Sequence, residues 1–371
     1  MSHTDGIFPI QALKQAAADG WIAGPPLAEG QLQPASLDLR LGTKAYRIQS
    51  SFLPQDRAVA EVLPELSMYE IDLEAGEGIL ERGNVYLIPL MESLALPEHV
   101  QGRTNPKSST GRLDIFTRVI TDNAYRFEEV RAGYTGPLYL EVVPRSFTVR
   151  VAPGLALNQL RLFSGQPRMG DAELAGLYRD EQLLYDEHGA PVSIDDALIR
   201  QGLFMSIDLK GDGDNDGVIG YKARRNSAVV DLTRIAAHPA AEYWDPIRTC
   251  RRGSLILEPE EFYIFASRER VRVPNHVAAE MVEYDAGSGE LRTHYAGFFD
   301  SGFGYGDNGA IKGTRAVLEV RPHDVPFRIT HAQVFFKLVY EHMIETPVTS
   351  YGQGGSHYQG QGLALSKHFK N

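Results

Sequence analysis

The sequence predicts a mainly β protein built from two tandem copies of a distorted β-barrel or jelly-roll domain, with a few short helices. Three observations support this fold class: an internal repeat, many short apolar runs, and abundant turn residues. The chain has 371 residues, of which 36 are Gly and 21 are Pro, and 43% of it is hydrophobic. Because a single core stops growing at about 250–300 residues, this length also indicates two domains.

Three blocks of the first half recur in the second half in the same order. Residues 36–40 recur at 206–210, and residues 140–142 recur at 318–320. Between them, the Leu-Pro-Glu-His-Val run at 96–100 recurs as Val-Pro-Asn-His-Val at 273–277. The offset between the copies grows only slowly along the chain, so we predict a duplicated domain rather than chance reuse of apolar patterns.

Local patterns predict the elements along the chain. A first helix is expected where Ile10, Leu13 and Ala17 share a face before Gly20. Two further helices are expected at 171–186 and 194–202. Strands are predicted at 37–41, 85–90, 138–143, 156–163, 229–232, 254–257, 262–266, 316–320 and 333–340. The expected division is a first domain at 1–168, a partly helical connection at 169–193, a second domain at 194–345, and a tail at 346–371.

Charge, cysteine content and hydropathy limit the partners and the cellular location that we expect for the protein. The formal net charge is −11, which argues against a nucleic-acid polymer, because no basic face is available for its phosphates. The single cysteine, Cys250, excludes an intrachain disulfide and fits a reducing compartment. No apolar run approaches about 18 residues and no signal-peptide pattern is present, so we expect a cytoplasmic protein without a membrane partner.

Two motifs complement each other across the repeat. Residues 105–112 form a small, basic, hydroxyl-rich loop suited to phosphate. Residues 296–303 have the pattern of a nucleoside-reading hairpin, followed by a strand that ends near Glu319. In the first copy the hairpin equivalent, 124–130, is bulky and charged, and in the second copy the loop equivalent, 285–289, has no basic residue. Each copy keeps one part, which predicts one nucleotide site per chain built from both kinds of copy.

In this order, the motifs resemble those of bacterial dCTP deaminases in the trimeric dUTPase-like superfamily. Residues 34–42 resemble the family's opening strand, and residues 107–112 resemble its phosphate and catalytic loop. Residues 296–303 with Glu319 resemble the base-binding hairpin and catalytic glutamate. Residues 351–362 resemble the tail that closes over the bound nucleotide. Ordinary members hold all of these motifs in a subunit of half this length, so the chain resembles a fused, tandem form.

The resemblance implies a set of site residues. The catalytic glutamate is Glu319 or its repeat equivalent Glu141, beside Ser108 and Arg112. Glu319 is favoured because its hairpin is intact, while Glu141 can be read as a salt-bridged strand-end carboxylate. The nucleotide-binding residues implied are Lys107, Ser109, Thr110, Gly111, Gln159, Ala296, Asp300, Phe303, Tyr351, His357 and Gln361. Of these, Gln159 can equally be an ordinary buried amide, and His357 stands where the family has lysine.

The implied reaction is hydrolysis of dCTP to dUTP and ammonia, with a glutamate as general base. Zinc deaminases hold their metal with one His and two Cys, or three Cys, and this chain has one cysteine and no such pattern. We therefore expect no zinc and no protein-held metal, only Mg²⁺ carried by the triphosphate. Residues 212–217 imitate a calcium loop, but Ala223 replaces the bidentate glutamate that such a loop needs.

Alternative functions stay open on the sequence alone. A dUTP diphosphatase, or a bifunctional enzyme that continues to dUMP, remains possible because Asp300 lies in the hairpin. A catalytically inactive nucleotide-binding regulator is the alternative outside enzymes, since a fold does not determine function. The resemblance implies the nucleotides dCTP and dUTP as partners, dTTP as a candidate inhibitor, and a homo-oligomer.

Overall fold

The computed structural model describes residues 5–76, 78–211, 216–249, 253–283, 291–293, 297–306, 309–353 and 358–370. The chain divides into two compact units. Unit 1 comprises 1–166, 225–242 and 366–371, and unit 2 comprises 167–224 and 243–365. Unit 1 thus contains two segments from the second half of the sequence. No helix among the described residues is long and apolar enough to cross a membrane.

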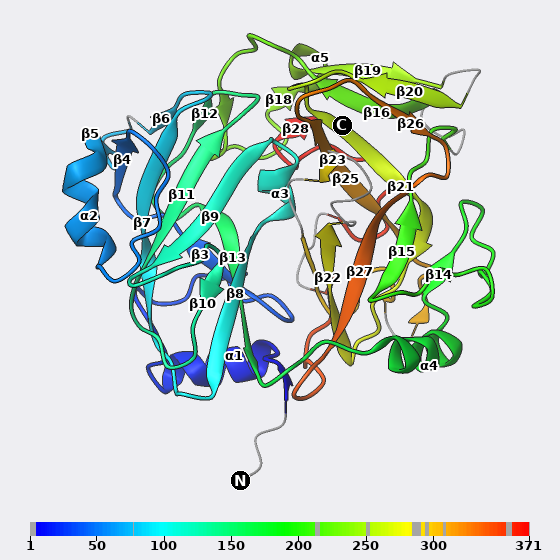
Figure 1. The fold of residues 1–371 in the computed structure, drawn as a ribbon, viewed down its shortest axis with the longest axis horizontal. Helices are drawn as coiled ribbons and strands as arrows, with labels where there is room; N and C mark the ends of the chain where they lie inside the picture. The colour runs from blue at the N-terminus through cyan, green and yellow to red at the C-terminus, as the bar shows by residue number, and fades with distance from the viewer. Residues whose placement is uncertain are drawn as a thin grey trace. The chain divides into compact units, whose positions relative to one another are not determined.

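The larger sheet of unit 1 is antiparallel and runs in the order β5-β4-β7-β11-β9, with β2 added on β7. Strand β11 is an inner strand of this sheet, paired on one side with β7 and on the other with the edge strand β9 (Figure 1). The bounds are β2 Ile22–Ala23, β4 Lys44–Ile48, β5 Ser67–Asp72, β7 Val85–Ala95, β9 Ile115–Thr121 and β11 Thr135–Pro144.

The second sheet of unit 1 runs β1-β13-β8-β10, with β3 also paired to β13. Smaller pairings join β12 to β6 and β17, and β18 to β28. The bounds are β1 Gly6–Ile7, β3 Leu37–Arg40, β6 Ile79–Leu80, β8 Val100–Pro106, β10 Glu129–Val130, β12 Val149–Arg150, β13 Ala156–Ser164, β17 Val230–Asp231, β18 His238–Pro239 and β28 Phe369–Lys370. The helices are α1 Ile10–Ala18, α2 Val59–Leu66 and α3 Ser108–Gly111.

Unit 2 repeats this plan. Its larger sheet runs β19-β16-β21-β25-β23 with β14 added on β21, and its second sheet runs β15-β27-β22-β24. A separate pair joins β20 to β26. The bounds are β14 Leu184–Tyr185, β15 Leu203–Ser206, β16 Val218–Ala223, β19 Trp244–Arg248, β20 Ser254–Leu257, β21 Tyr263–Val271, β22 Val277–Glu283, β23 Leu291–Thr293, β24 Phe298–Phe299, β25 Thr314–Pro322, β26 Phe327–Thr330 and β27 Val334–His342. Its helix α4 spans Asp171–Glu181, and α5, Ala240–Tyr243, lies where the chain passes from unit 1 to unit 2.

The strand orders confirm the internal repeat. The series β4-β7-β11-β9 in unit 1 corresponds to β16-β21-β25-β23 in unit 2. Likewise β3 and β15 both pair with the long strand of the second sheet, β13 or β27. Within β11 and β25, Glu141 lies opposite Leu87 and Glu319 lies opposite Ile264, which are equivalent positions of the two copies.

Buried apolar side chains form the core of each unit. In α1 the buried residues are Ile10, Leu13 and Ala16, one face of a helix of about 3.6 residues per turn. The inner strands β11 and β25 are buried along most of their length and carry runs of apolar residues, as expected where both faces of a strand are covered. In unit 2, Phe265, Leu318 and Phe336 belong to one continuous core.

The predicted strands and the first helix are confirmed, whereas the helix predicted at 194–202 is wrong. That segment forms a turn in which Asp196 N and Ala197 N both donate to Ser193 O, at 3.1 Å. Gly202 then adopts φ +129°, and a Cβ there would lie 2.8 Å from Leu338 O. The chain has to turn into β15 at this point, which prevents a helix. The helix predicted at 171–186 ends at Glu181, because Gln182 is left-handed.

Candidate active site

The phosphate-type loop of the first copy is a compact turn at the end of β8. Thr110 N and Gly111 N both donate to Lys107 O, at 2.8 and 3.0 Å, and Arg112 N donates to Ser108 O at 3.1 Å. Ser109, Thr110, Gly111 and Arg112 are buried, while Lys107 and Ser108 are half-buried. Lys107 and Ser108 are therefore the residues of this loop that are more open to a ligand.

Lys107 forms an ion pair with Asp38 of β3. Gln159 of β13 lies beside this pair, because its register partners are Asp38 on one side and Asn105 on the other. Its Oε1 accepts a hydrogen bond from Ser36 Oγ at 3.4 Å. The structure thus brings Lys107 and Gln159 together and adds Asp38, a residue of the opening strand for which the sequence predicts no role in the site.

Glu141 is fully buried in β11 and paired with a neighbour on β9. Its Oε1 accepts from Arg118 Nη2 at 2.6 Å and from Arg118 Nε at 3.0 Å. The Arg118 guanidinium also lies 3.6 Å from the centre of the Phe127 ring. Phe127 belongs to the bulky stretch that replaces the hairpin in this copy. The first-copy glutamate is therefore held by internal contacts.

Glu319 occupies the equivalent position on β25 and is buried. The hairpin motif of the same unit is built around β24, with Asp300 and Phe303 buried. Ser301 Oγ donates to Val277 O at 2.7 Å and fixes the turn. Gly302 adopts φ +95°, and a Cβ there would lie 2.9 Å from Asn275 Oδ1 and from Ser350 Cβ. This close approach explains the glycine at position 302, and the corresponding first-copy stretch 124–130 contains no glycine.

The tail residues that the structure describes fold onto this hairpin. Tyr351 N donates to Ser301 O at 2.8 Å, and the Tyr351 and Phe303 rings lie 5.4 Å apart. Gln359 bridges the turn, since its Oε1 accepts from Gly304 N at 3.0 Å and its Nε2 donates to Gly302 O at 3.1 Å. Hairpin and tail thus form one assembly within unit 2.

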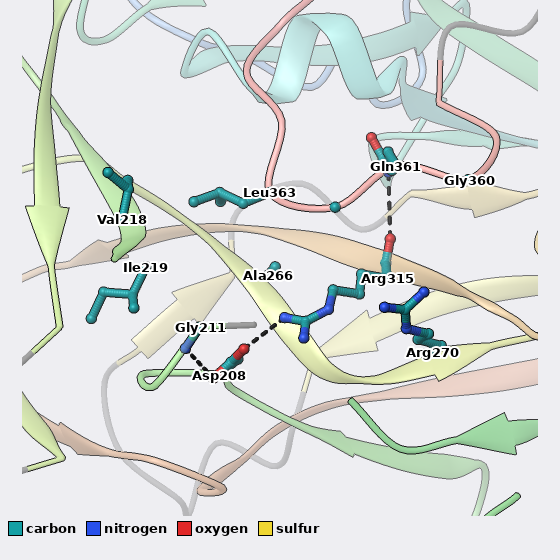
Figure 2. A pocket seen from close by; sticks show the side chains of 11 residues that line it. Asp208, Gly211, Val218, Ile219, Ala266, Arg270, Arg315, Gly360, Gln361 and Leu363 are labelled. Atoms are coloured by element: carbon teal, nitrogen blue, oxygen red, sulfur yellow. Dashed lines mark hydrogen bonds and ion pairs between the residues drawn. The ribbon is translucent and has the colours of Figure 1, made fainter. Parts of the chain in front are cut away.

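The tail also covers a cavity of about 410 Å³ beside β25 (Figure 2). Two arginines, Arg270 and Arg315, and one carboxylate, Asp208, supply its charge, and the tail supplies Gln361. Gln361 Nε2 donates to Arg315 O at 3.5 Å. The other lining residues are small or apolar: Gly211, Val218, Ile219, Ala266, Gly360, Gly362 and Leu363. One apolar wall and one cationic wall suit a flat ligand that carries an anionic group.

Asp208 is the repeat equivalent of Asp38, but its carboxylate has different hydrogen-bond and ion-pair partners. Its Oδ2 accepts from Arg315 Nη1 at 2.6 Å, and its Oδ1 accepts from the backbone N–H groups of Lys210 and Gly211 at 2.8 and 3.0 Å. Burial alone would raise the pKa of Asp208, but Arg315 and these backbone donors hold the pKa below its usual 3.8. Asp208 is therefore a stable anion inside unit 2.

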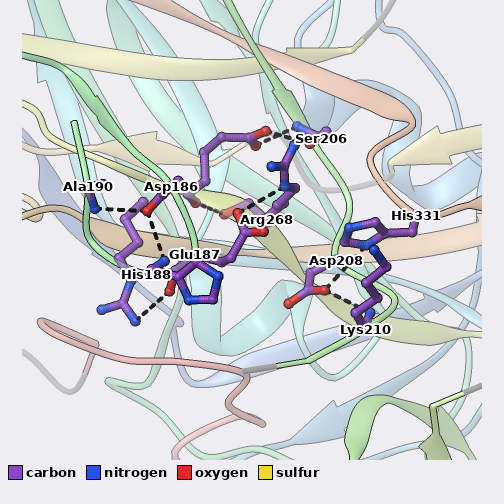
Figure 3. Close-up of polar contacts among 12 residues, drawn as sticks. Asp186, Glu187, His188, Ala190, Ser206, Asp208, Lys210, Arg268 and His331 are labelled. Atoms are coloured by element: carbon purple, nitrogen blue, oxygen red, sulfur yellow. Dashed lines mark hydrogen bonds and ion pairs between the residues drawn. The ribbon is translucent and has the colours of Figure 1, made fainter. Parts of the chain in front are cut away.

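A second cavity of unit 2, of about 460 Å³, lies by β15 and is bounded by a polar network (Figure 3). Ser206 N and Oγ both donate to Glu269, at 2.8 and 2.5 Å, and Arg268 Nε donates to Glu187 at 3.0 Å. His331 Nδ1 accepts from Leu209 N at 3.2 Å, and burial lowers the pKa of His331 below its usual range. These contacts hold the end of β15 and the residues that follow it, so we assign them a structural role.

The implied site residues thus fall into two groups. Unit 1 holds Lys107 to Arg112, Glu141 and Gln159, and unit 2 holds Asp300, Phe303, Glu319, Tyr351 and Gln361. Ala296 and His357 lie outside the described residues. The sequence reasoning missed Asp38, Asp208, Arg270 and Arg315. The repeated Ser-x-Asp of the opening strand was a usable signal for the two aspartates, whereas nothing in the local sequence marks the two arginines.

Among the described residues, no group of three or more His, Cys, Asp or Glu side chains is arranged to hold a metal ion.

Comparison with known proteins accounts for both halves of the chain. The N-terminal domain model of 2'-deoxycytidine 5'-triphosphate deaminase matches residues 4–166, and the C-terminal domain model of the same family matches residues 171–369. The crystal structure of 2'-deoxycytidine 5'-triphosphate deaminase from Agrobacterium tumefaciens superposes with a TM-score of 0.85 and 47% identity, over 93% of this chain and 99% of that one.

Shorter relatives match about one copy. A protein of Parafrankia sp. named "dCTP deaminase, dUMP-forming" is 31% identical over 144 residues, which are 37% of this chain and 66% of that protein, just under two thirds. The protein of the same name from Acidothermus cellulolyticus is 30% identical over 155 residues, 41% of this chain and 76% of that protein. A "dCTP deaminase" of Ignicoccus hospitalis is 26% identical over 159 residues, 42% of this chain and 83% of that protein. Since domain models of one family cover both halves, this chain belongs to the 2'-deoxycytidine 5'-triphosphate deaminase family.

Proposed function

We propose that the protein catalyses the hydrolytic deamination of dCTP to dUTP and ammonia. The observation that carries this proposal is the match of both halves to the two domain models of the deaminase family. The geometry of unit 2 supports it, because the hairpin and the tail are joined there, and the buried Glu319 lies on a strand that the tail also contacts.

In this proposal Glu319 is the general base. Water attacks C4 of cytosine, and Glu319 accepts its proton and passes it toward the ring and the amine. The C4–N4 bond then breaks, ammonia leaves, and C4 becomes a carbonyl carbon. Glu319 is preferred over Glu141 because it lies in the unit that keeps the intact hairpin and the tail, whereas Glu141 lies in the unit whose hairpin equivalent is bulky and charged.

The phosphate side of the proposal uses the Lys107 loop. Lys107 and Ser108 are the more accessible residues of the loop. Lys107 would bind the triphosphate, Ser108 would orient the attacking water, and Arg112 would keep the catalytic carboxylate charged. Mg²⁺ would enter as part of the substrate, bound to the triphosphate and neutralising part of its charge.

We also propose that one site uses the Lys107 loop of one copy and Glu319 of the other, either within one chain or between chains of a homo-oligomer. The support is the sequence, in which each copy has lost the motif that the other retains. We further propose a cytoplasmic location and inhibition by dTTP, which a steady-state assay with added dTTP would test.

A second candidate is a bifunctional enzyme that continues from dUTP to dUMP. It is favoured by the names of two relatives, "dCTP deaminase, dUMP-forming", and by the buried Asp300 in the hairpin. A plain dUTP diphosphatase would act on dUTP but release no ammonia from dCTP.

One experiment separates these functions. The pure protein is incubated with dCTP and Mg²⁺, released ammonia is measured, and the nucleotide product is identified by chromatography. Ammonia with dUTP supports the deaminase, and ammonia with dUMP and pyrophosphate supports the bifunctional enzyme. Nucleotide binding without any ammonia would contradict both and leave a diphosphatase or a non-catalytic regulator, which a parallel incubation with dUTP distinguishes.

A further inference from the structure

Two arginines of unit 2 lie directly opposite each other on neighbouring strands. Arg270 of β21 is the register partner of Arg315 of β25, so their side chains leave the same face of the sheet. Both line the cavity of about 410 Å³ beside β25 (Figure 2). Like charges placed directly opposite each other in an antiparallel pair are destabilising. The pair therefore needs a reason other than the stability of the sheet.

The first copy shows that the fold does not require these charges. Counted from the two equivalent glutamates and the residues opposite them, the positions in unit 1 are Ser93 of β7 and Pro137 of β11, which also lie opposite each other. Neither of them carries a charge. The same sheet is thus built with an uncharged pair in one copy and with two guanidinium groups at the wall of a cavity in the other.

The carboxylates around the pair are bonded to groups other than Arg270. Asp208 Oδ2 accepts from Arg315 Nη1 at 2.6 Å, and its Oδ1 accepts from two backbone N–H groups. The Glu187 carboxylate accepts from Arg268 Nε at 3.0 Å, and Arg270 Nη2 reaches only the Glu187 backbone carbonyl, at 3.5 Å. Within the described part of the chain, Arg270 Nε is buried and has no hydrogen-bond partner. Because a buried donor without a partner is costly, Arg270 has donor capacity that a ligand in the cavity would satisfy.

The tail closes this cavity through contacts of its own. Gly360 N donates to Thr314 Oγ1 at 3.2 Å, and Gln361 Nε2 donates to Arg315 O at 3.5 Å. A ligand under the tail would be largely removed from water, where an ion pair with a guanidinium group is stronger. Guanidinium groups present a fork of N–H donors that matches phosphate oxygens. A phosphate group offers three such oxygens, so it can accept from two arginines at once.

We propose that Arg270 and Arg315 form a phosphate-binding site of unit 2, made of other residues than the Lys107 loop. Phosphate oxygens accept from the Arg270 fork, and the anion offsets the repulsion between the two guanidinium groups, while Asp208 holds Arg315 in place. A free phosphate ion and the phosphate group of a nucleotide would make the same contacts. This inference goes beyond the proposed function and does not depend on it, because binding at the site needs no reaction.

The first test is calorimetric titration with inorganic phosphate. Arg270→Gln should weaken binding about 10- to 100-fold, the loss typical of one charge-assisted hydrogen bond. Arg270→Lys keeps the charge without the fork and should lose less. The matched control is Arg200→Gln, an exposed arginine of the same unit, which should bind as the wild type does. Since the Lys107 loop also suits phosphate, Lys107→Met is titrated in parallel and should retain the binding that depends on Arg270.

The second test is thermal unfolding with and without phosphate. In phosphate-free buffer Arg270→Gln should melt at a higher temperature than the wild type, because one of two opposed like charges is gone. Added phosphate should raise the melting temperature of the wild type more than that of the variant, since a ligand stabilises the form that binds it. An arginine with a merely structural role would give the reverse: a lower melting temperature without phosphate and an unchanged effect of phosphate.

Steady-state ammonia release distinguishes the two sources of the phosphate group. If it belongs to dCTP, Arg270→Gln should raise the KM for dCTP and change kcat little, because the contact is to a part of the substrate that does not react. If it is a free ion, the KM should stay as in the wild type. If no form of the protein releases ammonia, the proposed function fails, and the phosphate titration still decides the role of Arg270.

The proposal is overturned if folded Arg270→Gln binds phosphate like the wild type, if Arg200→Gln weakens binding equally, or if Lys107→Met abolishes all phosphate binding. Should Arg270→Gln fail to fold, labelling of the wild type with the arginine reagent phenylglyoxal decides, with the modified residues located by mass spectrometry. Phosphate should slow the labelling of Arg270 and leave that of Arg200 unchanged. Labelling of Arg270 at the same rate with and without phosphate overturns the proposal.

Discussion

The two copies place the same residues on the same strands and connect them to different partners. Asp38 forms an ion pair with Lys107 of the phosphate-type loop, whereas its equivalent Asp208 forms one with Arg315 of strand β25. Glu141 is bound by Arg118, whereas the equivalent Glu319 lies in the unit that keeps the hairpin and the tail. Equivalent residues therefore occupy the same backbone positions in the two copies. The role of each carboxylate depends on the side chains that surround it in its own copy.

The largest expected effect tests the two glutamates directly. Glu319→Gln should lower the rate of ammonia release about 10²- to 10⁴-fold, because the amide keeps the size of the side chain but cannot accept a proton. Glu141→Gln should keep the kcat of its folded fraction. Thermal unfolding of both variants is the control. An inactive Glu141→Gln beside an active Glu319→Gln would reverse the assignment.

Complementarity between the copies predicts one nucleotide per chain. Titration of dCTP into Glu319→Gln, which should bind without turnover, should reach one equivalent, and two equivalents would disprove the shared site. Mixing the inactive variants Arg112→Ala and Glu319→Gln then shows whether the site lies within one chain or between two chains. Partial recovery of ammonia release in the mixed oligomer would mean that the site joins two chains, and no recovery would mean that it lies within one.

The Arg118 pair should matter for stability rather than for chemistry. Arg118→Met leaves Glu141 buried without its cation, which should lower the free energy of unfolding by about 3–5 kcal/mol. Urea unfolding measures this. The double variant Arg118→Met/Glu141→Leu should recover part of the loss, since it removes the buried charge as well. A loss below about 1 kcal/mol in the single variant, as for an exposed pair, would show that the pair is not buried in solution.

The ion pair between Asp208 and Arg315 should make the stability of the protein depend on pH. The pKa of Asp208 is lowered in the folded protein relative to 3.8, so its ion pair contributes stability above that pH and loses the contribution as pH falls through the folded pKa. Asp208→Asn should therefore be less stable than the wild type near neutral pH, by about 1–3 kcal/mol, with the difference shrinking below pH 3.8. A difference in melting temperature that does not change with pH would contradict this ion pair.

The smallest effect is expected from zinc removal. Dialysis against a zinc chelator, followed by return of Mg²⁺, should leave ammonia release unchanged, because the single cysteine cannot build a His/Cys zinc site. Stoichiometric zinc in the pure protein, with activity that follows it, would overturn the carboxylate mechanism.

Features that depend on local sequence could be predicted, whereas features that depend on contacts between residues far apart in the sequence could not. Strands such as 138–143 and 316–320 were readable because short apolar runs with β-branched residues, bounded by turn residues, are local signals. Helix α2 was not predicted, because Pro64 lies inside it. The helix predicted at 194–202 was wrong, because the close approach of Gly202 to Leu338 depends on a strand that is distant in the sequence. The ion-pair partners of Asp38 and Asp208 could not be predicted either. Their pairing with Lys107 and Arg315 depends on the order of strands in the sheets, which no short window of sequence contains.

The pairing of β28 with β18 has a consequence for the order of folding. The hydrogen bond from Ser366 to Ser109 joins residues 257 positions apart in the sequence. Contacts of such separation are slow to form, because closing a long loop costs entropy before any contact compensates for it. On the ribosome, the first half of the chain can form its two main sheets early. It would then wait, with the Lys107 loop uncovered, until the second half has been synthesised and delivers both β18 and β28.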